Sequence, residues 1–336
     1  YPESNWMHKR MLGLSSRLAK LPEKQRSHAM RQKLYESQAN DAYWHGLFGG
    51  LYLPHLRRAV YRALVELEAL LDQCAPRPAT LMEEVYQHNG ILQAIIKLDS
   101  FASICELDAY QLNHNFGDTL RCQVEHYYQK MQLGAHSPPS HETTGIASAH
   151  DRISYKHQIA AEDTEADDHP RSLFVDRLDG EFIVYQHESP TVENNSFRSD
   201  HTLFPIRKNI SLEQNRLHVD YHFSDQMKQI FTTEINLAMP SCDGMGGRYV
   251  YQGKIPGGFG QLLELNHLTE IILDDDTLGG SVVLRTSSPV TLRAYPHYSV
   301  SQSESGFEKI MQAVTLQVEC PTAAQGLNIT LEINAR

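Results

Sequence analysis

The sequence has no long hydrophobic run and no excess of basic residues. None of its 336 residues lie in an apolar stretch of about 18, so a transmembrane helix is not expected and no membrane partner is predicted. There are 30 lysines and arginines against 41 aspartates and glutamates, for a formal net charge of −11. That balance disfavours nucleic acid as a partner, but it is compatible with a neutral ligand such as a sugar.

Cysteines are also few. The five are odd in number and scattered, and no CxxC pair occurs among Cys74, Cys105, Cys122, Cys242 and Cys320. This usage favours reduced thiols in a cytoplasmic protein over a disulfide framework or a zinc site. No secretory signal sequence is visible.

Metal and cofactor signals are weak, and we predict neither. His45 and His55 are ten residues apart across a proline, which is not the spacing of a helical zinc site. Asp274, Asp275 and Asp276 could hold calcium, but an acidic β-turn is the commoner arrangement.

The first 76 residues have helical periodicity. Apolar residues recur at spacings of four, three and four from Met7 to Leu18, which places them on one face of a helix. A proline at position 22 breaks this pattern, a polar helix follows, and Pro54 is predicted to open a third helix. The two prolines of "CAPRPAT" (74–80) end the region, so we predict domains at 1–76 and 77–336.

Beyond residue 81 the hydrophobic period changes to two. Alternation is strict in "RLHVDYHF" (216–223), "VTLQV" (314–318) and "NITLEI" (328–333), which predicts strands with one buried face. The predicted fold class is therefore α+β, mostly β, with a short helical bundle followed by a large antiparallel β-sandwich. Turns are expected at Gly279-Gly280 and Ser288-Pro289, and long loops near 131–170. We predict a polar, packed loop over 297–313.

The stretch "NDAYWHGLFGG" (40–50) is unusual for a core helix. A sugar ring stacks its apolar face on an aromatic side chain, while amide, carboxylate and imidazole groups bind its hydroxyls. The candidate substrate-binding residues are Asn40, Asp41, Tyr43, Trp44 and His45. The alternative is that Tyr43, Trp44 and Phe48 are core residues and that Asn40 only caps a helix.

The same stretch, extended to "NDAYWHGLFGGLYLPHLRRAVY", resembles the segment after the catalytic barrel in α-amylase/4-α-glucanotransferase enzymes of glycoside hydrolase family 57. "YPESNWMHKRM" resembles the opening of that helical region. "ELDAYQLNHNFGDTLRCQVEHYY", "EINLAMPSCDG", "LGGSVVL" and "PHYSVSQSESGFEKIMQAVTL" resemble successive parts of the sandwich. The matches run in order from residue 1 to about residue 320.

This resemblance implies an enzyme that cleaves α-1,4 bonds with retention and passes the glycosyl group to another sugar or to water. It also implies a galactose-mutarotase-like supersandwich. The family's glutamate nucleophile and aspartate acid/base lie on a (β/α)-barrel that precedes the helical region. No stretch of this chain matches either motif, so no catalytic residue is assigned.

By the same resemblance, the five candidate residues would line the sugar cleft, with Trp44 stacking on a glucose ring. The expected partners are an α-glucan or maltooligosaccharide and the catalytic barrel of the parent chain. Alone, the chain is expected to be inactive, and its exposed aromatic residues would favour a homo-oligomer. Two alternatives stay open: a stand-alone carbohydrate-binding or scaffolding module, and mutarotase-like chemistry using His297 or Glu304.

Overall fold

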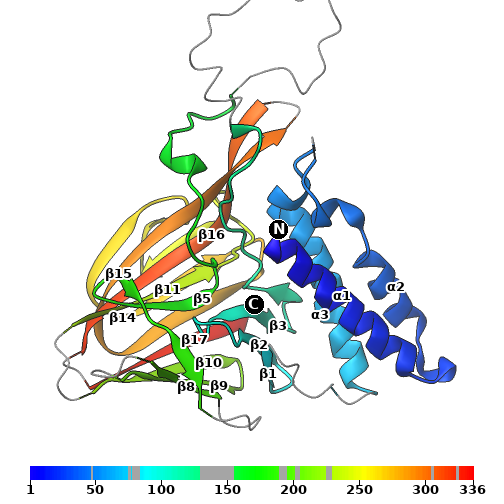
Figure 1. The fold of residues 1–336 in the computed structure, drawn as a ribbon, viewed down its shortest axis with the longest axis horizontal. Helices are drawn as coiled ribbons and strands as arrows, with labels where there is room; N and C mark the ends of the chain where they lie inside the picture. Colours follow the sequence, from blue (N-terminus) through cyan, green and yellow to red (C-terminus); the bar gives the residue numbers. More distant parts are fainter. Residues whose placement is uncertain are drawn as a thin grey trace, which may run out of the picture.

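A computed structural model shows three helices packed along one flank of a large curled antiparallel sheet (Figure 1). The predicted α+β, mostly β class is confirmed. The structure describes residues 1–46, 48–74, 77, 84–128, 155–188, 195–200, 205–224, 229–303, 306–322 and 325–336.

The helices follow the predicted pattern. They are α1 (Pro2–Lys20), α2 (His28–Glu36) and α3 (Pro54–Asp72), with short 3₁₀ turns η1 (Glu23–Gln25), η2 (Asn40–Tyr43) and η3 (Gly50–Tyr52). The Ser27 hydroxyl caps α2 by accepting the amide of Met30 at 3.2 Å. Pro54 opens α3, as the sequence predicts. No helix in the described part is long and apolar enough to cross a bilayer.

The strands follow in one antiparallel set, with a further 3₁₀ turn, η5 (Glu162–Thr164). They are β1 (Glu84–His88), β2 (Leu92–Lys97), β3 (Ile104–Ala109), β4 (His114–Asn115), β5 (Leu173–Leu178), β6 (Glu181–Phe182), β7 (Tyr185–His187), β8 (Asn195–Ser199), β9 (Arg207–Glu213), β10 (Arg216–His222), β11 (Ile230–Leu237), β12 (Gly247–Tyr251), β13 (Lys254–Gly258), β14 (Leu263–Asp275), β15 (Gly280–Ser303), β16 (Gly306–Pro321) and β17 (Gly326–Ala335).

Strand β15 changes partner along its length, and this corrects one predicted turn. It pairs with β17 from Gly280 to Thr286 and with β16 from Thr291 to Ser303. Ser288-Pro289 lies between these two pairings, inside the strand rather than in a turn. A proline has no amide hydrogen to donate, so a position where the ladder is interrupted tolerates it well. The turn at Gly279-Gly280 is confirmed.

The predicted polar loop over 297–313 is wrong, because this stretch forms the hairpin between β15 and β16. The density of polar residues suggested a loop, but two of these residues are small serines buried within the strand. Ser299 and Ser301 are both fully buried, and the Ser299 hydroxyl accepts a 2.8 Å hydrogen bond from Gln312. The predicted long loop is described only over 155–170, which is irregular apart from η5; residues 129–154 lie outside the described residues.

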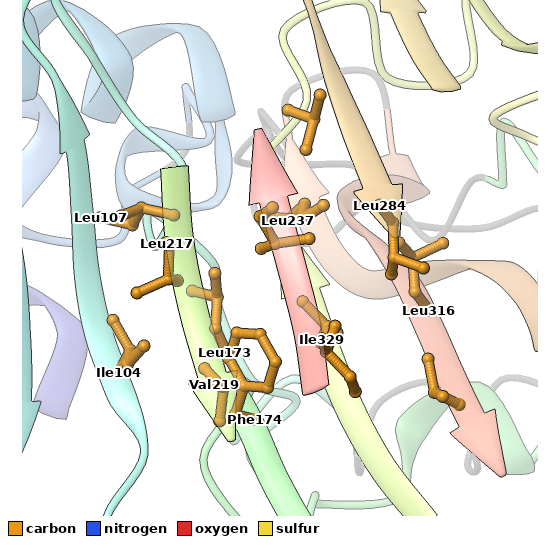
Figure 2. Close-up of a cluster of buried hydrophobic side chains, with 14 of the residues drawn as sticks. Ile104, Leu107, Leu173, Phe174, Leu217, Val219, Leu237, Leu284, Leu316 and Ile329 are labelled. Atoms are coloured by element: carbon orange, nitrogen blue, oxygen red, sulfur yellow. The ribbon is translucent and has the colours of Figure 1, made fainter. Parts of the chain in front are cut away.

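The core lies between the facing surfaces of the curled sheet. Figure 2 shows Leu107, Leu173, Leu217, Val219 and Ile329 converging there from four different strands. The predicted alternation is confirmed, because the apolar residues of the three alternating stretches are buried. Each fully buried side chain of this size contributes about 1.5–3 kcal/mol of transfer free energy.

A buried ionic cluster joins the helices to the sheet. The guanidinium of Arg10 (α1) binds Glu106 (β3) at 2.9 Å and Glu68 (α3) at 2.5 Å. Trp6 donates its indole N–H to Glu106 at 2.8 Å. Arg57 (α3) likewise binds Asp118 at 2.8 Å in a buried position. These contacts hold α1 and α3 on the sheet. The predicted domain boundary at residue 76 stays a prediction.

Candidate functional site

The predicted sugar-binding stretch forms the connection between α2 and α3. Gly49 and Gly50 have φ values of +94° and +49° in this connection. A Cβ atom on Gly50 would lie 2.2 Å from the carbonyl oxygen of Trp44. That carbonyl accepts the Leu51 amide at 2.9 Å, which closes the loop around the glycine. The fold of the loop therefore depends on glycine at position 50.

Trp44 is half-exposed, with 49% of its surface accessible, and Phe48 is 75% exposed. The Trp44 ring lies against Gly46, where a Cβ atom would be only 2.3 Å from Cζ3. Trp44, Phe48 and Asp41 line a hollow of about 110 Å³. Aromatic faces beside a carboxylate are the surface that a sugar ring needs.

A larger hollow of about 500 Å³ adjoins this one and shares Asp41 and Leu56 with it. It lies between α2 and α3. Its charged lining includes Lys33, which binds Glu36 at 2.8 Å and the α3 residue Glu66 at 2.7 Å. Lys33 and Glu36 in this lining are therefore already engaged in ion pairs.

The other candidate residues are placed differently. Asn40 is exposed, and Ala39 rather than Asn40 is the N-cap of η2. Tyr43 packs partly buried against the helical core and donates its hydroxyl to the Ser37 carbonyl at 2.6 Å. Burial raises the pKa of Tyr43 to about 12. The structure therefore brings Asp41 and Trp44 to one hollow, while Tyr43 lies among core residues.

His45 turns toward the sheet domain. Its ring lies edge-on to Tyr52 at 4.7 Å and to Tyr127 at 5.3 Å between centroids. Nδ1 is buried without a hydrogen-bond partner. Burial lowers the pKa of His45, so the neutral imidazole is favoured. The histidine is thus adjacent to Trp44 in sequence but enclosed by tyrosines.

Sequence reasoning missed a cluster of polar residues in the sheet domain. Glu234 accepts hydrogen bonds from Asn236 at 2.8 Å and Arg171 at 3.0 Å, and its carboxylate lies 3.1 Å from His169. These hydrogen bonds and charges outweigh burial and lower the pKa of Glu234 to about 2. No local signal could have found the cluster, because its two halves, His169 with Arg171 and Glu234 with Asn236, are more than 60 residues apart in the sequence.

One group of potential metal ligands exists among the described residues: Cys122, Asp167 and His297. Each is already engaged, since His297 bonds the Leu120 carbonyl at 3.0 Å and the Cys122 thiol bonds the Tyr298 carbonyl at 3.1 Å. Asp167 accepts the Cys122 amide at 2.6 Å. Burial is the main cause that lowers the pKa of His297 to about 4. Glu304, the other residue suggested for mutarotase-like chemistry, lies outside the described residues.

The aspartate triplet ends β14 and leads into the turn before β15, and ion pairs and hydrogen bonds hold it there. Asp274 and Asp276 both bind Arg248 and Arg336. Asp275 accepts the Ser241 hydroxyl at 2.6 Å and the Leu278 amide at 2.9 Å. This is the arrangement that the acidic β-turn interpretation expects.

The comparisons with known proteins decide the family. The sequence matches the description "Alpha-amylase/4-alpha-glucanotransferase, middle domain" over residues 1–71. It matches the description "Alpha-amylase/4-alpha-glucanotransferase, C-terminal" over residues 82–197 and 180–333. The chain belongs to the alpha-amylase/4-alpha-glucanotransferase family. The resemblance stated from the sequence is confirmed.

The family's relatives are about twice as long as this chain. A 4-alpha-glucanotransferase of Thermococcus kodakarensis is 27% identical over 97% of the chain but only 50% of the relative. An alpha-amylase of Pyrococcus furiosus is 28% identical over 94% of the chain and 47% of the relative. The crystal structure of the Thermococcus litoralis 4-alpha-glucanotransferase superposes with a TM-score of 0.71 at 23% identity, covering all of this chain and 50% of that one.

His114 gives this family member a testable pH dependence. Its buried ring bonds the Ala238 carbonyl at 2.7 Å and packs on Phe116, and burial lowers its pKa to about 4. Between pH 4 and the ordinary histidine pKa, the unfolded chain binds more protons at this site than the folded chain does. We therefore expect the free energy of unfolding to rise with pH across that window.

A His114→Gln variant keeps a donor for the Ala238 carbonyl but cannot titrate. We expect its free energy of unfolding to rise less steeply between pH 4 and pH 6.5 than that of the wild type, by about 3 kcal/mol in total. Urea denaturation at several pH values measures this difference. Parallel curves for the two proteins would contradict the prediction.

Proposed function

We propose that this chain is the non-barrel part of an α-glucan-active 4-α-glucanotransferase or α-amylase. In this proposal the α2–α3 connection forms one wall of the sugar cleft, and the sheet domain supports it. The main observation in support of this proposal is the half-exposed Trp44, whose ring lies against Gly46 beside Asp41 and Phe48. A further support is that the chain spans about half the length of the curated relatives it matches.

The chemistry of glycoside cleavage explains why sugar binding and catalysis would be assigned to different parts of the parent enzyme. Retaining cleavage of an α-1,4 bond needs two carboxylates about 5–5.5 Å apart, one acting as nucleophile and the other as acid/base. In this proposal those groups belong to the barrel, while Trp44 stacks on a glucose ring and Asp41 accepts from a sugar hydroxyl. The chain alone would then bind sugar without cleaving it. The partners are an α-glucan and the barrel.

Replacing Trp44 with alanine tests the sugar wall. We expect maltoheptaose to change the tryptophan fluorescence of the wild-type chain, and the Trp44→Ala variant to bind it about tenfold more weakly, because a stacking surface is lost. Affinity is measured by isothermal titration calorimetry, so that it does not depend on the lost fluorophore.

An exposed aromatic residue away from the loop provides the control. Tyr35→Ala on α2 removes a side chain that is 66% exposed and does not line the Trp44 hollow, so its affinity should match the wild type. The same samples, incubated with maltoheptaose and resolved by size, should yield no new oligomers. Equal affinities for wild type and Trp44→Ala would defeat the sugar-wall role, and redistributed oligomers would show a carboxylate pair within this chain.

A further inference from the structure

The segment after β4 reaches from the sheet domain to the loop that carries Trp44. Glu125 on this segment accepts two hydroxyl groups at the same oxygen, Oε1: that of Tyr1 at 2.7 Å and that of Tyr52 at 2.6 Å. Tyr1 and Tyr52 come from the helical part, at the start of α1 and at the end of η3. One carboxylate from the sheet domain therefore ties two points of the helical part together.

The same segment encloses His45. The His45 ring lies edge-on between Tyr52 and Tyr127, and Tyr127 packs edge-on against Tyr128 at 5.1 Å. Tyr127 and Tyr128 both donate their hydroxyls to the carbonyl of Val300 on β15, at 3.1 Å each. An unbroken series of contacts thus runs from the residue beside Trp44 to a strand of the sheet.

The base of the loop is held from the same side. Gln312 on β16 donates to the Tyr52 carbonyl at 2.9 Å, and Arg57 donates to the Leu51 carbonyl at 2.5 Å. Farther out in the loop, the Trp44 side chain is half-exposed and the Phe48 side chain is 75% exposed. The contacts of His45 with Tyr52 and Tyr127 lie between this base and the exposed aromatic residues.

We propose that Glu125 and Tyr127 are positioning residues that set the orientation of Trp44. Together with Tyr52 and His45 they form a clamp (Glu125, Tyr127, Tyr52 and His45). Through this clamp the sheet domain controls the sugar-facing loop. The consequence for sugar binding rests on the function proposed above. The consequence for the loop itself does not, because it concerns the ligand-free chain.

Tryptophan quenching by acrylamide reports on this loop directly. The chain has two tryptophans, and Trp6 is only 7% exposed, so quenching of the ligand-free protein reports mainly on Trp44. In Glu125→Leu the Tyr1 and Tyr52 hydroxyls lose their acceptor. We expect the Stern–Volmer constant to rise by up to about twofold, because half of the Trp44 surface is still covered in the wild type.

Sugar affinity should fall in the same variant. If the bound orientation of the loop becomes a tenth as populated, the apparent Kd for maltoheptaose rises about tenfold. Glu125→Gln, which keeps an acceptor oxygen, should restore both quenching and affinity toward the wild-type values. Tyr127→Leu, which removes a wall of the His45 enclosure, should reproduce the effects of Glu125→Leu.

Glu188→Leu is the matched control. Glu188 also accepts two donors, Ser196 and Arg207, but neither contacts the loop, so its loss should leave Trp44 quenching unchanged. Circular dichroism and urea denaturation establish that each variant is folded. Should Glu125→Leu fail to fold, Tyr127→Leu and Tyr52→Phe carry the same test.

The two proposals fail in different ways. Wild-type quenching in folded Glu125→Leu and Tyr127→Leu variants would overturn the clamp, whether or not maltoheptaose binds. Increased quenching in a protein that binds no maltoheptaose would support the clamp and overturn the sugar wall. Equal loosening in Glu125→Leu and Glu188→Leu would mean a general loss of stability, and would also overturn the clamp.

Discussion

Replacing Arg10 with alanine should lower the free energy of unfolding by about 3–5 kcal/mol, because it leaves buried carboxylates without their cation. Arg10 is 5% exposed and contacts Glu68, Glu106 and Asp108. The three carboxylates outweigh burial and raise the pKa of Arg10, whereas burial itself raises the pKa of Asp108. Urea denaturation followed by circular dichroism measures the loss.

Arg31→Ala is the control for this experiment. Arg31 also forms an ion pair, with Glu23, but the two side chains are 41% and 71% exposed to solvent. An exposed pair contributes about 0–1 kcal/mol, so the two variants should differ by several kcal/mol. Similar losses for Arg10→Ala and Arg31→Ala would show that the cluster does not hold the helices on the sheet.

The Arg10 cluster also shows what the sequence could not reveal. Its members belong to α1, α3 and β3. Within its own segment, each looks like an ordinary charged surface residue. Helical periodicity did predict the apolar stripes on either side of it, because those depend on spacing within one element. Charged residues that are buried through pairing between distant elements leave no periodic signal.

The candidate site also has a part that the sequence predicted and a part that it could not reveal. The composition of 40–50 predicted a sugar-binding surface, and the structure places Trp44 and Asp41 at one hollow. The sequence could not show that Tyr43 packs among the helices or that His45 contacts Tyr52 and Tyr127. The glycines are the residues of this stretch that say most about its backbone conformation, because the close approach of the Trp44 carbonyl requires glycine at position 50.

Within the sheet, a buried lysine links four strands. Lys208 on β9 is fully buried and binds Asp176 on β5 at 2.9 Å. Asp176 also accepts the hydroxyls of Tyr185 at 2.9 Å and Tyr221 at 2.8 Å. Burial lowers the pKa of Lys208, and Asp176 opposes that shift. The cluster thus pairs its charges inside an apolar core.

A backbone irregularity supplies the remaining bond of this lysine. Where β5 pairs with β11, Val175 faces Glu234 and Leu173 faces Ile235, so Phe174 is an extra residue in the ladder. Phe174 has φ +64°, which is uncommon for a residue with a side chain. Its carbonyl accepts Lys208 at 2.7 Å. The bulge therefore supplies an acceptor that a regular ladder would have used between strands.

We expect Lys208→Met to lower the free energy of unfolding by about 3–5 kcal/mol, since Asp176 would remain buried without its cation. Lys208→Met combined with Asp176→Asn should be more stable than Lys208→Met alone, because the buried charge is removed. Urea denaturation of the four members of this cycle gives the coupling energy. Lys156→Met, which breaks the more exposed pair with Glu308, should cost at most about 1 kcal/mol. Additive losses for Lys208 and Asp176 would contradict the prediction, because two residues that neutralise each other in an apolar core cannot be removed independently.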